Sequence, residues 1–378
     1  MQVDGRRRLS DEQRLNWLRL IRSENVGPAT FRDLINHYGT AAAALEALPE
    51  LAARGGLASR IRVASEADAH KELAAATRAG AAFVALGEPE YPPLLAALDH
   101  PPPLIAVRGN AAIAAARPVA IVGARNASVA GQKFAARLAA ELGQAGHTIV
   151  SGLARGIDAA AHRASLPTGT VAVFAGGIDR VFPEEHAELA ERIADSGGAL
   201  VSEMPMGWQA RAIDFPRRNR IIAGLAQGVV VVEAARRSGS LITARLANEA
   251  GRQVFAIPGS PLDPRAEGTN HLIRQGATLS TCAADVMEAL APLGAGQTPY
   301  EAGEGDELPT GESRSPASED ALARVRAVIV DALGPAPTEI DDIVRYCGAS
   351  VPETLMVLLE LDLAGRIERH PGNRVSLA

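Results

Sequence analysis

Cysteine is scarce in this 378-residue chain: Cys282 and Cys347 are the only two, and neither belongs to a Cys-x-x-Cys or Cys/His pattern. A disulfide framework and a zinc site are therefore not expected. Long apolar runs are missing too, since the longest have the length of strands and a membrane helix needs roughly 20 residues. The N-terminal segment lacks the apolar stretch and cleavage site of a signal peptide. These absences predict a cytoplasmic protein without a membrane partner or a bound metal.

The motifs of common nucleotide chemistry are also absent. The strand-like run at 119–122 is followed by GARNAS, which has one glycine and does not form the Gly-x-Gly-x-x-Gly fingerprint of dinucleotide sites. No Gly-x-x-x-x-Gly-Lys-Ser/Thr loop occurs, which removes the ordinary case for ATP hydrolysis. The segment Ser238-Gly239-Ser240 lacks the Gly-x-Ser-x-Gly frame of a nucleophile elbow. We therefore expect no cofactor.

Four acid or base residues are candidates for catalysis. Asp158 and His162 are four residues apart and would share a helical face, while Glu203 and Glu233 follow predicted strands. Each has an equally good structural explanation, because a carboxylate at a helix start gains from the helix dipole and a histidine packs readily. No complete catalytic set emerges, and we predict that the protein is not an enzyme.

The length implies two or three domains, since one ordinary core does not extend over this many residues. Residues 1–65 have a helical pattern, and residues 66–290 alternate between strand and helix patterns. Residues 291–318 are rich in Gly, Pro, Glu, Ser and Thr, the composition of a solvated linker. Residues 319–378 show three short helical patterns and then a hairpin, which is the layout of a winged helix.

The alternating segment predicts an α/β fold, a doubly wound and mostly parallel sheet with helices on both faces. Before it, Gly27-Pro28 separates two helical stretches and predicts an all-α helical hairpin. Two extra strands are expected at Phe83–Leu86 and Leu104–Val107. The clearest strands are Val119–Val122, Thr148–Val150, Thr170–Phe174, Ala199–Val201, Gly228–Val232 and Gln253–Ile257.

Glycine and arginine follow several of these strands. The carboxyl ends of parallel strands meet at one edge of a sheet, where helix N-termini offer free N–H groups to anions. Taken singly, each glycine is explained by a tight turn and each arginine by a solvated loop. Together they favour phosphate binding, although the net charge of −6 argues against a general polyanion surface. The residues concerned are Arg125, Gly152, Arg155, Gly156, Gly176, Gly177, Arg217, Arg218, Arg220, Arg236 and Arg237.

Several loops of this kind suit a polymer of phosphates better than one nucleotide. Single-stranded nucleic acid also needs flat side chains on which bases stack. Aromatic residues make up only 3% of the chain, yet Phe182, Trp208 and Phe215 lie on or near these loops. Stacking platforms and ordinary core residues both remain open for them.

Six ordered motifs between about Tyr91 and Ala277 resemble the DNA processing protein A family, also called Smf. They are IVGARNAS, IVSGLARGIDAAAHRASL, GGIDRVFPEEHAEL, FPRRNRIIAGLAQGVVVVEA, SGSLITARLANEAGRQVFAIPG and GTNHLIRQGA. The resemblance implies a Rossmann-like core with an N-terminal domain of the sterile-alpha-motif or helix-hairpin-helix kind and a C-terminal winged-helix domain. It further implies a homodimer that binds single-stranded DNA and loads RecA recombinase during natural transformation.

The same resemblance implies which residues contact DNA. Where many relatives have a lysine or asparagine near the GGIDRVFPEEH turn, this chain has Glu185 and His186, which argues against a positive contact there. The expected DNA-binding residues are Gly123, Arg125, Ser151, Gly152, Arg155, Gly156, Phe215, Arg217, Arg218, Asn219, Arg220, Ser238, Gly239, Ser240 and Thr243.

Two other functions compete with this one. Rossmann-like nucleotide phosphoribohydrolases carry a Pro-Gly-Gly-x-Gly-Thr loop and a catalytic glutamate, but here RRSGSLITA has no acid before Glu249. A duplex-DNA binder would use the terminal domains. Residues 25–34 contain few basic side chains, and the C-terminal arginines alternate with acids such as Asp341 and Asp342. A protein-contact role suits the terminal domains better.

Overall fold

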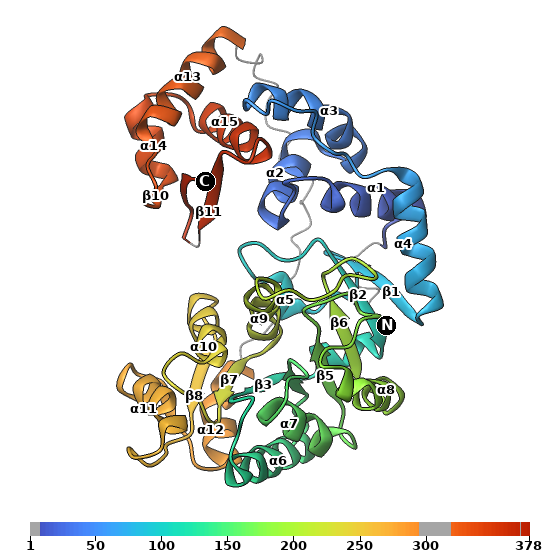
Figure 1. Cartoon of the computed structure of the whole chain (residues 1–378), viewed down its shortest axis with the longest axis vertical. Helices are drawn as coiled ribbons and strands as arrows, with labels where there is room; N and C mark the ends of the chain where they lie inside the picture. The colour runs from blue at the N-terminus through green and yellow to red at the C-terminus, as the bar shows by residue number, and fades with distance from the viewer. Residues whose placement is uncertain (1–7, 295–318, 371) are drawn as a thin grey trace. The chain divides into compact units, whose positions relative to one another are not determined.

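The computed structural model describes residues 8–294, 319–370 and 372–378, which form two compact units (Figure 1). The central unit contains residues 71–294 with Arg8, and the second unit joins residues 9–70 to residues 319–378. Both ends of the chain therefore contribute to the same unit. Among the described residues, no helix has the length and apolar character needed to span a membrane.

The central unit is built on a nine-stranded sheet with the order β1-β2-β6-β5-β4-β3-β7-β8-β9. All neighbouring strands are parallel except for the pairs β1–β2 and β2–β6. The predicted doubly wound, mostly parallel sheet is thus confirmed. Its strands are β1 (Ala81–Ala85), β2 (Leu104–Gly109), β3 (Val119–Val122), β4 (Ile149–Ser151), β5 (Thr170–Val173), β6 (Ala199–Ser202), β7 (Gly228–Val231), β8 (Gln253–Ala256) and β9 (Thr278–Leu279).

Helices cover both faces of this sheet, and the valine run of β7 shows why. Val229 and Val231 pack into one hydrophobic core with α9 and α10, while Val230 and Val232 pack into the other with α6, α7 and α12. A strand that is buried on both faces has to be apolar at every position. The helices are α4 (Glu66–Arg78), α5 (Pro93–Ala96), α6 (Val129–Gln144), α7 (Ile157–Ser165), α8 (Ala187–Asp195), α9 (Asp214–Leu225), α10 (Gly239–Glu249), α11 (Glu267–Arg274) and α12 (Ala283–Gly294), with short 3₁₀ turns η1 (Ala111–Ala115), η2 (Glu184–His186) and η3 (Pro264–Ala266).

One predicted boundary and one interpretation of the sequence change. The linker was expected to begin at residue 291, but α12 continues to Gly294, and residues 295–318 lie outside the described residues. A solvated loop would explain the arginines of FPRRNR taken singly, yet this segment is helical, because α9 already begins at Asp214. An acidic residue and a proline in the first turn both favour a helix start at this point.

Strand β3 is the topological switch point, because the chain continues to β4 on one side of it and β7 lies on the other. In sheets of this type, a crevice opens outside the carboxyl ends of the strands at the switch point. The loops after β3 and β7 border that crevice.

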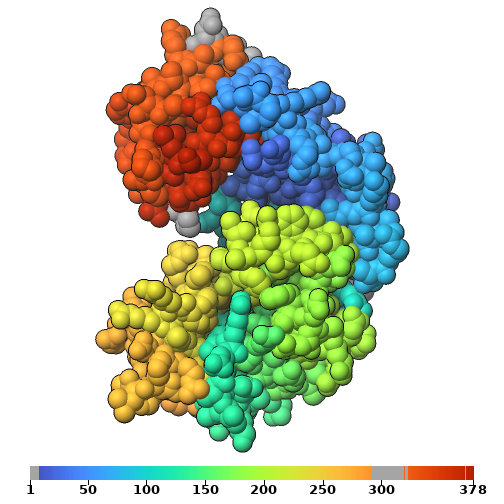
Figure 2. Space-filling model, viewed as in Figure 1, coloured from blue at the N-terminus to red at the C-terminus, as the bar shows by residue number. Residues whose placement is uncertain are grey.

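The second unit combines two small helical modules. The first consists of α1 (Asp11–Arg22), α2 (Pro28–Tyr38) and α3 (Ala41–Arg54), and a capping box at Ser10 starts α1. The second contains α13 (Glu319–Ala332), α14 (Ile340–Cys347) and α15 (Val351–Leu363), with a sheet of order β10-β12-β11. The strands are β10 (Thr338–Glu339), β11 (Ile367–His370) and β12 (Arg374–Leu377). Three helices and a small sheet form the predicted winged helix. Figure 2 shows the N-terminal residues in blue packed against the C-terminal residues in orange and red.

Candidate functional site

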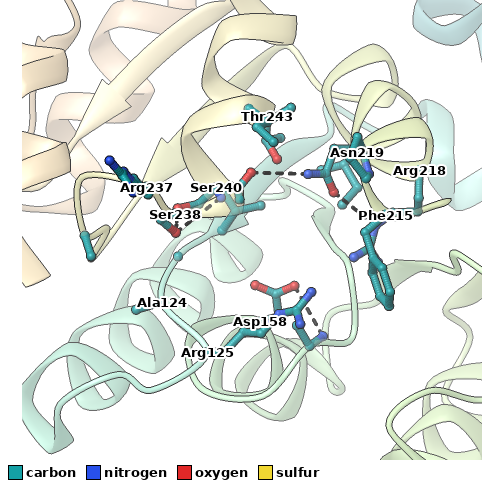
Figure 3. A pocket seen from close by; sticks show the side chains of 18 of the residues that line it. Ala124, Arg125, Asp158, Phe215, Arg218, Asn219, Arg237, Ser238, Ser240 and Thr243 are labelled. Carbon is teal, nitrogen blue, oxygen red and sulfur yellow. Dashed lines mark hydrogen bonds between the residues drawn. The ribbon is translucent and has the colours of Figure 1, made fainter. Parts of the chain in front are cut away.

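A cavity of about 750 Å³ opens at the crevice between β3 and β7 (Figure 3). Most of its lining comes from the loop after β3, the first half of α9, and the loop after β7 together with the start of α10. Ala154 and Asp158, which follow β4, and Arg265 of η3 also line it. Its size is that of a small-ligand pocket. The cavity brings together these predicted site residues: Gly123, Arg125, Phe215, Arg218, Asn219, Ser238, Gly239, Ser240 and Thr243.

Two glycines hold the loop after β3 in place. A Cβ at Gly123 would lie 2.6 Å from Cγ1 of Ile157, and one at Gly156 would lie 2.3 Å from the carbonyl oxygen of Ala124. Gly156 also has a φ of 73°, a conformation that side-chain-bearing residues rarely adopt. The two glycines therefore allow the loops after β3 and β4 to pack against each other at the cavity wall.

We call three residues the rim: Arg125 and Phe215, which line the cavity, and Phe182, which packs against Phe215. The guanidinium carbon of exposed Arg125 lies 5.0 Å from the centre of the Phe215 ring, which is cation–π geometry. The Phe182 ring meets Phe215 edge-to-face at 5.6 Å and is 53% exposed. The rim thus offers both a positive charge and an exposed aromatic surface.

Arg218 is buried, unlike its neighbour Arg217. It donates to the carbonyl oxygens of Gly152 and Val173, the latter at 2.6 Å. Burial lowers the pKa of Arg218 to about 10, and Asp158 opposes this shift, so the guanidinium stays charged at neutral pH. Carbonyl groups thus accept from its Nη1 and the Asn219 amide oxygen accepts from its Nε, so fewer of its donors are available to a phosphate than expected; its contact with DNA stays a prediction, because Arg218 lines the cavity.

Asp158 also lines the cavity, and its carboxylate fixes the loop after β4. Its Oδ2 accepts from the amides of Gly152 and Ala154 at 3.1 and 3.3 Å. Burial raises the pKa of Asp158, and the charge of Arg218 opposes this rise. Ser151 belongs to the same framework, because it is fully buried and donates to the carbonyl oxygen of Ile121. Ser151 and Gly152 are buried where β4 meets this loop. Direct contacts of these two residues with DNA, which the sequence led us to expect, therefore do not agree with their burial.

The other catalytic candidates are also structural. His162 is buried, its Nδ1 lies 2.8 Å from Oγ1 of Thr170, and burial lowers its pKa to about 3. Glu233 accepts from the amide and hydroxyl of Ser128. Glu203 forms an ion pair with Arg220. Among the described residues, no group of three or more His, Cys, Asp or Glu side chains is placed to hold a metal.

The remaining arginines divide into paired and free ones. Arg155 donates to both carboxylate oxygens of Glu185, at 2.8 and 2.6 Å, so the acid noted in the sequence neutralises it. Arg220 donates to Glu203 and to the carbonyl oxygen of His100. Arg217 and Arg237, by contrast, are exposed and form no hydrogen bond or ion pair with the described parts of the chain.

Arg237 was among the arginines that favour phosphate binding but not among the expected DNA-binding residues, and Arg265 was in neither group; both line the cavity. Arg237 precedes the Ser-Gly-Ser turn directly after β7, and this position was a usable signal. Arg265 lies in η3, beyond β8, and no local pattern indicates that this turn reaches the cavity. Its guanidinium forms an ion pair with Asp263 at 2.9 Å.

The start of α10 supplies uncharged donors. Ser238 caps the helix, and its hydroxyl oxygen lies 2.8 Å from that of Ser240. Asn219 donates to the carbonyl oxygen of Gly239 and ties α9 to this turn. Thr243 is 1% exposed, and its hydroxyl, which has no partner among the described residues, points into the cavity in Figure 3. Because this hydroxyl faces the cavity, it is available to donate to a ligand oxygen.

Three family models match the chain. The model described as DNA recombination-mediator protein A matches residues 82–291, a DprA-like N-terminal HHH domain matches residues 11–75, and a DprA winged helix domain matches residues 313–373. Protein Smf of Escherichia coli (strain K12) is 42% identical over 290 residues, 76% of this chain and 75% of that protein. Protein Smf of Synechocystis sp. is 31% identical over 398 aligned residues, 97% of this chain and 99% of that protein.

Two solved structures are similar as well. DNA processing protein A from Streptococcus pneumoniae has 40% identity and a TM-score of 0.55, with 59% of this chain and 77% of that chain covered. DNA processing protein A from Helicobacter pylori has 26% identity and a TM-score of 0.51, with 56% and 96% covered. The description of the latter structure names a single-stranded DNA binding mode.

Proposed function

The chain belongs to the DNA recombination-mediator protein A family, and from that membership we propose that its central unit binds single-stranded DNA at the cavity between β3, α9 and α10. One observation carries the proposal: exposed arginines, the N-terminus of α10 and the Phe215 ring line one cavity, and the exposed Phe182 ring packs against Phe215. The single-stranded DNA binding named for the Helicobacter pylori relative supports it.

The phosphate contacts come from two kinds of donor. Arg125 and Arg237 are exposed and line the cavity, and Arg217 is exposed on α9, the helix whose first half lines it. Arg217 and Arg237 have no carboxylate partner among the described residues. Their guanidinium groups match phosphate oxygens in charge and geometry. The N-terminus of α10 adds the partial positive charge of the helix dipole, and the Thr243 hydroxyl is oriented towards the same space.

The bases would stack on the rim. Phe182 exposes about half of its surface beside Phe215, and Arg125 already lies over the Phe215 ring. Stacking on aromatic side chains contributes about 1–3 kcal/mol per base and depends little on sequence. Binding without strong sequence preference follows from this combination of phosphate contacts and stacking.

Fluorescence anisotropy with a labelled oligothymidine tests the proposal. We expect the logarithm of the affinity to fall linearly with the logarithm of the salt concentration, because counterions are released. Replacing Arg125, Arg217 and Arg237 together with alanine should weaken binding and reduce the salt slope by about 2, since each phosphate contact on a single strand contributes about 0.7. Arg192→Ala, on the exposed face of α8, is the matched control and should leave affinity and slope unchanged.

Binding that does not depend on salt concentration, or an equal loss of affinity in the control, would refute this site.

A phosphoribohydrolase remains the alternative for a cavity of this size. An enzyme of this kind would release free base from nucleoside monophosphates. We expect no base release, because Asp158, a carboxylate that lines the cavity, is held by Gly152, Ala154 and Arg218.

A wider role in natural transformation is proposed from the family to which the chain belongs. The protein would act in the cytoplasm as a homodimer, protect incoming DNA during natural transformation, and load RecA recombinase on the bound strand. The division into residues 1–65, 66–290, 291–318 and 319–378 is proposed as well, with DNA binding in the second part and with α12 extending into the third part as far as Gly294. Sedimentation velocity tests the dimer, and RecA-dependent strand exchange with and without the protein tests loading.

A further inference from the structure

Helix α15 of the winged helix is packed on two sides. In winged helices and other helix-turn-helix proteins that read DNA, the helix at this position enters the major groove. Here Val357, Leu358 and Leu361 pack into the core of the winged helix. Leu359 and Leu363 pack instead into the core of α1, α2 and α3. Helix α15 is therefore shared by both modules of the second unit (Figure 1).

The approach between the two modules is closest at Gly55, directly after α3. A Cβ at this position would lie 1.9 Å from the carbonyl oxygen of Glu360 and 2.9 Å from Cβ of Ala364. The φ of Gly55 is −64°, which any residue adopts, so the requirement for glycine is steric. The backbone after α3 thus lies directly against α15.

Polar contacts fasten the same interface. Thr30 donates to Oδ2 of Asp362 at 2.8 Å, and Asn25 donates to the carbonyl oxygen of Leu363 at 2.9 Å. Arg369 bridges the modules, because it pairs with Asp33 on α2 and with Asp362 on α15, each at 2.8 Å. The free-energy cost of burying the Asp362 carboxylate is therefore offset by two partners, Thr30 from the N-terminal helices and Arg369 from the winged helix.

The winged helix also lacks the charge that duplex DNA requires. Residues 319–378 contain ten acidic residues, six arginines and no lysine. Arg326 pairs with fully buried Glu360, and Arg345 pairs with Asp342. The first residues of α15, at which a DNA-reading helix contacts bases, are Val351, Pro352 and Glu353, which bring no cation.

We propose that the winged helix of this chain is a docking domain that holds the N-terminal helices through α15, and that it does not bind duplex DNA. The docking surface consists of Leu359, Leu363, Asp362 and Arg369, and its partner is the apolar face of α2 and α3 around Gly55. This inference concerns the second unit and does not depend on the proposed binding of single-stranded DNA.

Cross-linking in the full chain tests the docking. In a background with Cys282→Ser and Cys347→Ser, the pair Thr30→Cys and Asp362→Cys should form a disulfide within one chain on mild oxidation. The control pair Thr30→Cys and Asp342→Cys, with the second cysteine on the exposed face of α14, should not. Equal cross-linking of both pairs, or of neither, would overturn the docking.

A bulky side chain at Gly55 tests the proposed interface by steric hindrance. Gly55→Val in the Thr30→Cys and Asp362→Cys background should reduce the cross-linked fraction at least tenfold, because the new side chain displaces α15. Gly334→Ala is the matched control, since a Cβ at Gly334 meets nothing within 4 Å, and it should cross-link like the parent. Cross-linking of the Gly55→Val protein at the parental level would contradict the proposed interface.

A titration of labelled duplex tests the second half of the proposal. The full chain with Arg345→Glu and Arg374→Glu, both exposed on the winged helix, should bind a duplex with the affinity of the wild type within about twofold. If the winged helix contacted duplex DNA, reversing two charges would weaken binding by more than tenfold and change its salt dependence. That outcome would overturn the proposal, and an oligothymidine titration of the same protein reports separately on the central unit.

Discussion

Arg217 and Arg218 are neighbours in the chain and have opposite roles. Successive residues of an α-helix point about 100° apart, so α9 directs Arg218 into the protein and Arg217 into solvent. Arg218 donates to the carbonyl oxygens of Gly152 and Val173 and neutralises Asp158, whereas Arg217 forms no ion pair with the described residues. The first is part of the framework, and the second is available to a ligand.

Arg218→Met should therefore destabilise the protein by about 3–5 kcal/mol, because it leaves Asp158 buried without its charge partner. For a unit of this size the melting temperature should fall by about 10 °C. Arg217→Ala should stay within about 0.5 kcal/mol of the wild type and weaken oligothymidine binding. Calorimetry and anisotropy on both variants check this, and a large stability loss in Arg217→Ala would contradict the assignment.

His162 makes stability depend on pH. Its pKa is lowered by burial to about 3, whereas an unfolded histidine titrates near 6.5. Between these values the unfolded chain binds the proton and the folded chain does not, so stability falls as the pH drops below 6.5. At pH 5 the loss should be about 2 kcal/mol relative to neutral pH. Urea unfolding of wild type and His162→Gln at both pH values checks this: the histidine contribution should vanish in the variant.

At the scale of elements, loop–loop packing determines the shape of the cavity. The loops after β3 and β4 come together only because Gly156 has no side chain and a positive φ. Helix α10, by contrast, starts at Gly239, where a Cβ would meet nothing within 4 Å. Position 156 therefore requires glycine, whereas position 239, at the start of α10, tolerates another residue.

Gly156→Ala should cost about 1–3 kcal/mol from backbone strain alone, and it should displace the loop that carries Arg125. Oligothymidine binding should weaken together with stability. Gly239→Ala is the matched control and should be neutral for stability, because alanine fits the first turn of a helix. Thermal unfolding of both variants measures the difference, and equal melting temperatures would show that the two loops do not pack as described.

At the scale of the whole molecule, the second unit is discontinuous in sequence. Its N-terminal helices share a core with Leu359 and Leu363, which lie about three hundred residues further along the chain. The burial of each leucine contributes about 2 kcal/mol. The N-terminal helices are therefore expected to depend on the C-terminal residues for stability.

Truncation after residue 294 should expose this dependence. Limited proteolysis within residues 9–70 should become more than tenfold faster, because both leucines leave the core. Oligothymidine affinity of the truncated chain should stay within about twofold of the full chain, since the proposed site belongs to the central unit. A large loss of affinity would place part of the site in the second unit.

The strands, the glycine-rich turns and the winged-helix pattern could be predicted from sequence, because apolar periodicity and turn residues act over a few neighbouring positions. Arg125, Gly123 and the start of α10 were expected at one edge of the sheet, and the structure brings them to one cavity. Sequence could not separate Arg218 from Arg217, include Arg265, or show that α15 is packed on both sides. Those features depend on contacts between segments far apart in the chain, and only the folded chain creates them.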